Sequence, residues 1–168
     1  ERVETVLPDI MRRSGIDMWI IIAREYNEDP VIKTLLPATW HAARRTTMLV
    51  AYDPGEDKPL ETFGISRYNT GELFKTEWNR ESQPDQWKAL AEMISSKDPE
   101  KIGINKSNTF GLADGLSATH YDQLMEALPK KYHSRVVSAE AIAVGWLETR
   151  TNSEMTVYRN IFLTTAII

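Results

Sequence analysis

A short apolar run, MWIIIA at residues 18–23, constrains the fold more than any other part of the sequence. The run is too short for a typical helix and is rich in β-branched and aromatic residues, which indicates a strand. Because the strand has no polar face, both of its faces must be covered. A sheet covered by helices on both faces is the arrangement of α/β proteins, and the run therefore predicts an α/β fold.

The rest of the first 140 residues supplies the other elements of such a fold. We expect helices at residues 1–17, 84–96 and 117–128. We expect further strands at residues 46–53, 60–66, 101–105 and 134–139. The second and third strands form an antiparallel pair, whereas the last two strands are separated by a helix and are parallel. The sequence thus predicts an α/β domain over residues 1–140, with a mixed sheet of five to six strands and helices on its faces.

Individual residues support these boundaries. Gly15 is expected to end the first helix, and Ser117 is expected to cap the helix at 117–128. The intervening segment, 67–83, has no regular pattern, and we expect three aromatic residues to pin it to the sheet: Tyr68, Phe74 and Trp78.

Composition excludes several classes of function. Twenty basic residues against 24 acidic ones give a net charge of −4, and no long basic face is visible, so we expect no nucleic-acid partner. No apolar run approaches the roughly 18 residues of a membrane span, and no signal peptide is visible, so we expect no membrane partner. The chain has no cysteine, which excludes disulfides and thiolate sites and fits a cytoplasmic location. Since the first residue is Glu rather than Met, we expect both ends to be boundaries within a longer protein.

Catalytic motifs are absent from the sequence. The three histidines, His41, His120 and His133, are far apart, and none has the spacing of a zinc motif, so packing or surface roles are expected. The glycines form no phosphate-binding loop. The residues alone therefore predict no catalytic and no metal-binding residue.

Two loops are candidate binding regions. The first follows the buried strand and presents Arg24, Tyr26, Asn27 and Glu28, at a position where α/β sheets often bind ligands. The alternative is a structural loop in which Asn27 and Asp29 bond the local backbone. The second loop carries Trp40, His41, Arg44 and Arg45. It can form a substrate-facing edge, or the arginines can pair with Glu25, Glu28 or Asp29 while Trp40 lies in the core.

The last segment has the pattern of a helix start. Thr151 and Glu154 have the spacing of a capping box. An apolar stripe follows at helical spacing, formed by Met155, Tyr158, Ile161, Phe162, Thr165 and Ile168.

The whole chain resembles the N-terminal domain of the creatinase/prolidase/aminopeptidase P family, the pita-bread metallopeptidases. The stretches that carry the resemblance are GIDMWIIIAREYNEDPVI, ARRTTMLVAYD, KIGINKSNTFGLADGLSATHYDQL and, most specifically, VGWLETRTNSEMTVYR. In the family a stretch of this last form begins the first helix of the catalytic domain, and Glu154 and Arg159 occupy its characteristic positions. The phrase IIIAREYNEDP is typical of bacterial Xaa-Pro peptidases.

The resemblance implies a ribonuclease-H-like α/β fold and a division of the chain at residue 140. Residues 141–168 are then a connector and the first helix of a separate catalytic domain, against which Tyr158, Ile161 and Phe162 pack. The implied chemistry is hydrolysis of short proline-containing peptides by two divalent ions, manganese, cobalt or zinc, whose ligands belong to that other domain. The N-terminal domain is expected to aid formation of a homodimer and to shape substrate access through the two candidate loops.

Other functions remain open at this point. The parent protein can be a creatinase-like amidinohydrolase, or a catalytically inactive relative in which this domain is a binding or scaffold module. A nuclease site on the sheet would need clustered acids on central strands, and the strands carry only edge acids such as Asp17 and Asp53.

Overall fold

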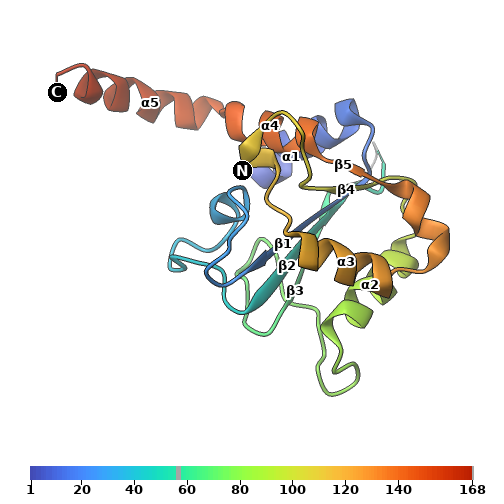
Figure 1. Ribbon diagram of the computed structural model, residues 1–168. Helices are drawn as coiled ribbons and strands as arrows, with labels where there is room; N and C mark the ends of the chain where they lie inside the picture. The colour runs from blue at the N-terminus through green and yellow to red at the C-terminus, as the bar shows by residue number, and fades with distance from the viewer. Residues whose placement is uncertain (56–57, 168) are drawn as a thin grey trace.

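The computed structural model describes residues 1–55 and 58–167 and forms an α/β domain from which one long helix projects (Figure 1). The elements in chain order are α1 (Arg2–Ser14), β1 (Met18–Arg24), η1 (Ile32–Thr34), β2 (Thr46–Tyr52), β3 (Glu61–Ser66), α2 (Gln86–Lys97), β4 (Ile102–Ile104), η2 (Gly111–Ala113), α3 (Ala118–Ala127), η3 (Lys130–Arg135), β5 (Val136–Ser138), α4 (Glu140–Glu148) and α5 (Asn152–Thr165). The expected elements are therefore confirmed. Part of the β2–β3 loop, residues 56–57, and Ile168 of the predicted apolar stripe lie outside the described residues.

The strands form a mixed sheet in the order β3-β2-β1-β4-β5. β2 is antiparallel to both β1 and β3, which confirms the predicted hairpin. β5 is parallel to β4, as the strand–helix–strand pattern predicted, and β4 is also parallel to β1. Because β1, β4 and β5 are parallel, their carboxyl ends lie at the same edge of the sheet.

The central strand β1 is buried on both faces, as its apolar run predicted. Alternate residues point to opposite sides of a strand. Trp19, Ile21 and Ala23 therefore join one core cluster, which includes buried residues of α1 and α4. The other set of β1 residues, from Met18 to Ile22, joins a second cluster with residues of α2 and α3. The two cores explain why this sequence forms a three-layer structure.

The ends of the helices follow from local chemistry. Gly15 adopts the left-handed conformation, with φ 61°, and its N–H donates to the Arg12 carbonyl in the last turn of α1 at 3.0 Å, while the Ile16 N–H donates to the Met11 carbonyl at 3.2 Å. The Ser117 hydroxyl accepts from the His120 N–H at 3.2 Å and caps α3. Both predicted helix ends are confirmed.

The segment at 67–83 is fixed in part as predicted, because Phe74 and Trp78 pack against the core clusters on the two faces of the sheet. Phe74 is fully buried, and Trp78 is half-buried and donates through Nε1 to the Gln83 carbonyl at 2.7 Å. Tyr68, however, is 40% exposed, so the prediction that it pins the segment is wrong. The backbone of the segment also attaches it to the sheet, since the Gly64 N–H donates to the Lys75 carbonyl at 2.8 Å.

The two C-terminal helices have opposite environments. In α4, Ile142, Ala143 and Trp146 are buried in the core that contains α1, and Trp146 Nε1 donates to Thr34 Oγ1 at 2.7 Å. α5 projects away from the domain, and none of its described side chains is buried (Figure 1). The division of the chain at residue 140 stays a prediction. None of the helices in the described ranges is long and apolar enough to cross a membrane.

Candidate functional site

The two candidate loops meet at one edge of the sheet. Arg24, the last residue of β1, pairs with Thr46, the first residue of β2. The Glu25 N–H donates to the Arg45 carbonyl at 2.8 Å, and the Arg45 N–H donates to a Glu25 carboxylate oxygen at 3.3 Å. The antiparallel pairing of β1 and β2 thus places side by side two loops that the sequence analysis treated separately.

Arg44 lies against two aromatic rings at this edge. Its guanidinium carbon is 4.8 Å from the centre of the Trp40 ring and 5.7 Å from that of Tyr68. Trp40 is half-buried rather than part of the core, and His41 is exposed. Cation–π contacts of this kind stabilise a guanidinium by about 0.5–1 kcal/mol at exposed positions and hold it in one orientation.

Two residues of the loops have backbone conformations that side chains other than glycine seldom adopt. Tyr26 has φ 69° and Arg45 has φ 55°. The Asn27 N–H donates to the Arg24 carbonyl at 2.9 Å, and Glu28 accepts from the Tyr26 N–H at 3.1 Å, so Tyr26 lies at the tip of a tight turn. Its side chain is 91% exposed. Backbone strain that exposes an aromatic ring is typical of binding sites.

A further arginine joins this edge from β3. Thr47 pairs with Ser66, so Arg67 follows beside Thr46 on the side opposite to Arg24. Residues opposite each other on neighbouring strands point to the same face of a sheet. Arg24 and Arg67 therefore both lie on the face covered by α2 and α3.

One buried histidine lies close to this face. His120 is 4% exposed and packs against Trp87, with the ring centres 5.6 Å apart, which confirms a packing role. Burial lowers the pKa of His120, and the positive charge of Arg24 lowers this pKa further.

We name the combined region the Arg–aromatic surface and define it by Arg24, Trp40, Arg44, Arg45, Arg67 and Tyr68. Sequence reasoning found four of these residues. It missed Arg67, whose only signal was its position directly after a strand, and it assigned Tyr68 to the sheet.

A buried polar network beneath the first loop was also missed. Asp29 is fully buried, and one carboxylate oxygen accepts from the Val31 N–H at 2.7 Å and the Ile32 N–H at 3.3 Å. The other oxygen accepts from the Asn105 amide at 2.8 Å, and Asn105 in turn accepts from Trp19 Nε1 at 2.7 Å. Burial raises the pKa of Asp29, although these hydrogen bonds act in the opposite direction.

Through the side chains of Asp29, Asn105 and Trp19, this network joins the candidate loop to β1 and to the residue that follows β4. It fits the structural interpretation that the sequence analysis left open for Asp29, because the carboxylate bonds the local backbone before η1. Asn27 instead contributes its backbone N–H to the turn at Tyr26. The first candidate loop thus contains both an exposed residue, Tyr26, and a buried residue with a structural role, Asp29.

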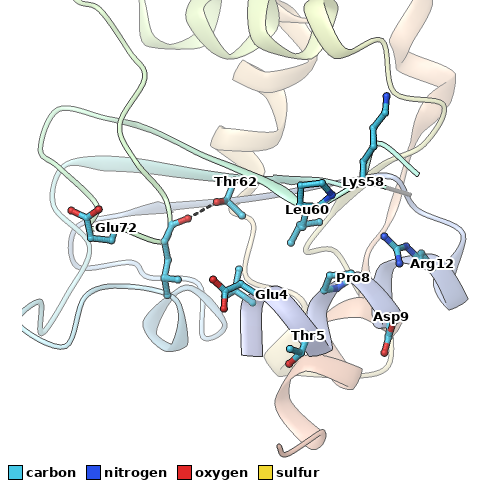
Figure 2. A pocket seen from close by; sticks show the side chains of 12 residues that line it. Glu4, Thr5, Pro8, Asp9, Arg12, Lys58, Leu60, Thr62 and Glu72 are labelled. Carbon is cyan, nitrogen blue, oxygen red and sulfur yellow. Dashed lines mark hydrogen bonds between the residues drawn. The ribbon is translucent and has the colours of Figure 1, made fainter. Parts of the chain in front are cut away.

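A separate open pocket of about 470 Å³ lies between α1 and the region of β3, away from the two candidate loops. Figure 2 shows Glu4, Pro8 and Arg12 of α1 on one side and Lys58, Leu60 and Thr62 on the other. Its charges are already engaged in part, since Arg12 donates to Asp53 at 2.8 Å. Within the described part of the chain, no group of three or more His, Asp or Glu side chains is arranged to hold a metal ion.

The start of α5 is attached to the domain through Arg2. The Arg2 guanidinium carbon lies 4.0 Å from the centre of the Trp146 ring, and one of its nitrogens donates to the Thr149 carbonyl at 3.0 Å. Its Nε lies 3.5 Å from Glu154. Glu154 also accepts from the Thr151 N–H at 2.8 Å while Thr151 Oγ1 accepts from the Glu154 N–H at 3.2 Å, so the predicted capping box is confirmed.

Arg2→Ala is expected to leave the domain folded but to release the direction of α5, because Arg2 contacts α4, the connecting residues and α5 at once. The chain has no native cysteine, so nitroxide labels can be attached selectively at Glu126→Cys and Asn160→Cys. Double electron–electron resonance then measures the distance between the two labels, which reports the direction of α5. We expect one narrow distance distribution in the parent and a broad one in Arg2→Ala. Arg159→Ala, which removes an exposed arginine of α5, is the matched control and should leave the distribution narrow. An unchanged distribution in Arg2→Ala would contradict this role.

The comparisons with known proteins concern the fold. The chain matches no protein-family model and no curated protein. Among solved structures it is similar to the Xaa-Pro dipeptidase from Bacillus anthracis, with a TM-score of 0.57 and 14% identity over 89% of this chain and 36% of that chain. It is also similar to the N-terminal domain of the cytoplasmic peptidase PepQ from Mycobacterium tuberculosis H37Rv, with a TM-score of 0.51 and 14% identity over 83% of this chain and 94% of that chain.

These similarities confirm the predicted fold class. The mixed five-stranded sheet with helices on both faces is the architecture shared with the two peptidase structures. The chain spans only 36% of the length of the Xaa-Pro dipeptidase, whereas it corresponds to almost the whole of the isolated PepQ domain. The structure is therefore an α/β domain with the fold of the N-terminal domain of such peptidases.

Proposed function

We propose that this chain is the N-terminal, non-catalytic domain of a bacterial Xaa-Pro metallopeptidase of the creatinase/prolidase/aminopeptidase P family. The observation that carries the proposal is the fold shared with the Xaa-Pro dipeptidase and with the PepQ N-terminal domain. By analogy with PepQ, whose name describes it as cytoplasmic, we place the protein in the cytoplasm.

The environment of α5 supports the proposal independently. Ile161 is 53% exposed and Phe162 is 71% exposed, although the helix is capped and regular. An apolar helix face of this kind is normally covered by another part of a protein. In our proposal, α5 is the first helix of the catalytic domain, and Tyr158, Ile161 and Phe162 pack inside that domain.

The metal chemistry belongs to the catalytic domain in this proposal. Two divalent ions, manganese, cobalt or zinc, would polarise the scissile carbonyl and supply a nucleophile for cleavage of short proline-containing peptides. The residues described in this domain do not provide a fitting set of ligands. In this proposal the domain carries out no step of the reaction.

The role proposed for this domain is to shape access to the catalytic site and to aid formation of a homodimer. The candidate loops lie together at one edge of the sheet, where a strained turn exposes Tyr26 and a stacked pair presents Arg44. Such an edge suits a surface that faces a substrate entrance.

The experiment compares the isolated 168-residue chain with a longer protein in which a pita-bread domain follows α5. We expect the longer protein to hydrolyse Ala-Pro in the presence of Mn²⁺. The isolated chain should show neither hydrolysis nor stoichiometric binding of Mn²⁺. Cleavage of Ala-Pro by the isolated chain, or binding of two ions to it, would overturn the proposal.

A pair of substitutions tests the role of α5 in the same proteins. Ile161→Glu with Phe162→Glu should change the free energy of unfolding of the isolated chain by less than about 0.5 kcal/mol, because both side chains are exposed there. In the longer protein the same two substitutions should lower the free energy of unfolding by about 2 kcal/mol or more, since charges would replace buried apolar groups. Equal changes in the free energy of unfolding in the two proteins would show that α5 does not pack against the catalytic domain.

A further inference from the structure

We propose that the Arg–aromatic surface binds an acidic segment of a partner polypeptide, with Arg44 at its centre. The inference goes beyond the proposed function and does not depend on it, because it concerns only a surface of these residues and is tested on the isolated chain.

Four positively charged side chains gather at this edge of the sheet. Arg24, Arg44, Arg45 and Arg67 are all exposed at the same edge of the sheet. Among the ion pairs of the described residues, none involves these four arginines. The nearby Glu25 and Glu28 accept from backbone N–H groups instead.

Four arginine charges are therefore concentrated on a chain whose net charge is −4, and the carboxylates of Glu25 and Glu28 offset only part of them. An arrangement of this kind attracts an anionic partner and orients it during encounter. The complementary chemistry is a group of carboxylates.

The central arginine, Arg44, contacts two aromatic rings in the unbound protein. Arg44 lies over Trp40 and beside Tyr68, at 4.8 and 5.7 Å from the ring centres. Stacking against a ring fixes the plane of a guanidinium while its N–H groups stay available for a carboxylate. Because contacts with the two rings restrict the arginine before binding, less conformational entropy is lost when a carboxylate binds.

The strained backbone points to the same surface. Of the three described residues other than glycine that have positive φ, two, Tyr26 and Arg45, belong to the loops at this edge. The strain is maintained by the Glu25–Arg45 contacts and by the turn at Tyr26. Such strain persists where a fold requires a specific surface shape.

The composition favours a polypeptide over a nucleic acid. Arginine, tryptophan and tyrosine are the residues that dominate the energetics of protein–protein interfaces. A nucleic-acid site is expected to follow a long basic stripe that contacts many phosphates. The four arginines of the Arg–aromatic surface lie only at the ends of β1, β2 and β3, and the chain as a whole has a negative net charge.

The test uses hexaglutamate with blocked ends as the probe and isothermal titration as the measurement. At low salt we expect saturable binding to the 168-residue chain, with a dissociation constant below about 1 mM that rises with ionic strength. Amide shifts in NMR spectra should be largest near Trp40, Arg44 and Tyr68. Arg44→Ala combined with Arg67→Ala should weaken binding about tenfold, from roughly threefold for each arginine.

Arg80→Ala is the matched control. Arg80 is also exposed and also lies over a tryptophan, 5.7 Å from the ring centre of Trp78, but neither residue is among those that define the Arg–aromatic surface. Arg80→Ala should change the affinity for hexaglutamate less than twofold, after correction for the change in net charge. An equal loss in Arg80→Ala, no binding up to several millimolar peptide, or tighter binding of a thymidine oligonucleotide of equal charge would each overturn the inference.

Discussion

Replacement of Asp29 by alanine is expected to lower the free energy of unfolding by about 3 kcal/mol. The carboxylate is fully buried and accepts from two backbone N–H groups and from the Asn105 amide. Removing it leaves these donors buried without an acceptor, and Asn105 loses the contact that orients it toward Trp19. Urea denaturation of the parent and the variant measures the difference.

The pH dependence gives this prediction a second readout. Because burial raises the pKa of Asp29 above its usual value of 3.8, the folded protein retains a proton that the unfolded chain has released. The stability gained from Asp29 is thus fully present below that usual value and decreases as the pH rises through the raised folded-state pKa. The difference in unfolding free energy between parent and Asp29→Ala should therefore narrow as the pH rises above the usual value and become constant above the raised folded-state pKa.

Asp122→Ala provides the control for Asp29→Ala. Asp122 is exposed on α3, and its replacement should change the free energy of unfolding by less than about 0.5 kcal/mol. If Asp29→Ala were no more destabilising than Asp122→Ala, the buried network would have no structural importance.

The second large effect is expected at Gly64 in β3. A methyl group built at this position would lie 2.8 Å from the Phe74 carbonyl oxygen and still closer to the Thr70 hydroxyl. Since backbone atoms form part of the obstruction, the side chain cannot be accommodated by a change of rotamer. Gly64→Ala should therefore lower the free energy of unfolding by about 2–3 kcal/mol.

The same substitution should loosen the segment that crosses β3. The Gly64 N–H donates to the Lys75 carbonyl at 2.8 Å, and the Glu77 N–H donates to the Gly64 carbonyl at 3.0 Å. Hydrogen exchange at the amides of these two donors should accelerate in the variant. Gly111→Ala is the control, because a methyl group there would have no neighbour within 4 Å, and stability should be unchanged. Comparable losses in both variants would show that space at Gly64 is not the cause.

The candidate site shows why sequence reasoning succeeded only in part. Arg24 and Arg44 could be identified because each belongs to a polar loop next to a strongly predicted strand. Arg67 and the contact of Arg44 with Tyr68 depend on strand register, which pairs residues distant in the sequence. Likewise, nothing local indicates that Asp29 reaches Asn105, 76 residues away.

The sequence by itself determined the strands, the helices and their ends, because apolar periodicity, the cap at Ser117 and the glycine stop at Gly15 act over a few neighbouring residues. It also determined that the central strand needed cover on both faces. Only the tertiary structure decided which loops form one surface, which acid is buried and where α5 points. These features arise from contacts between segments far apart in the chain, and their geometry exists only once the sheet has assembled.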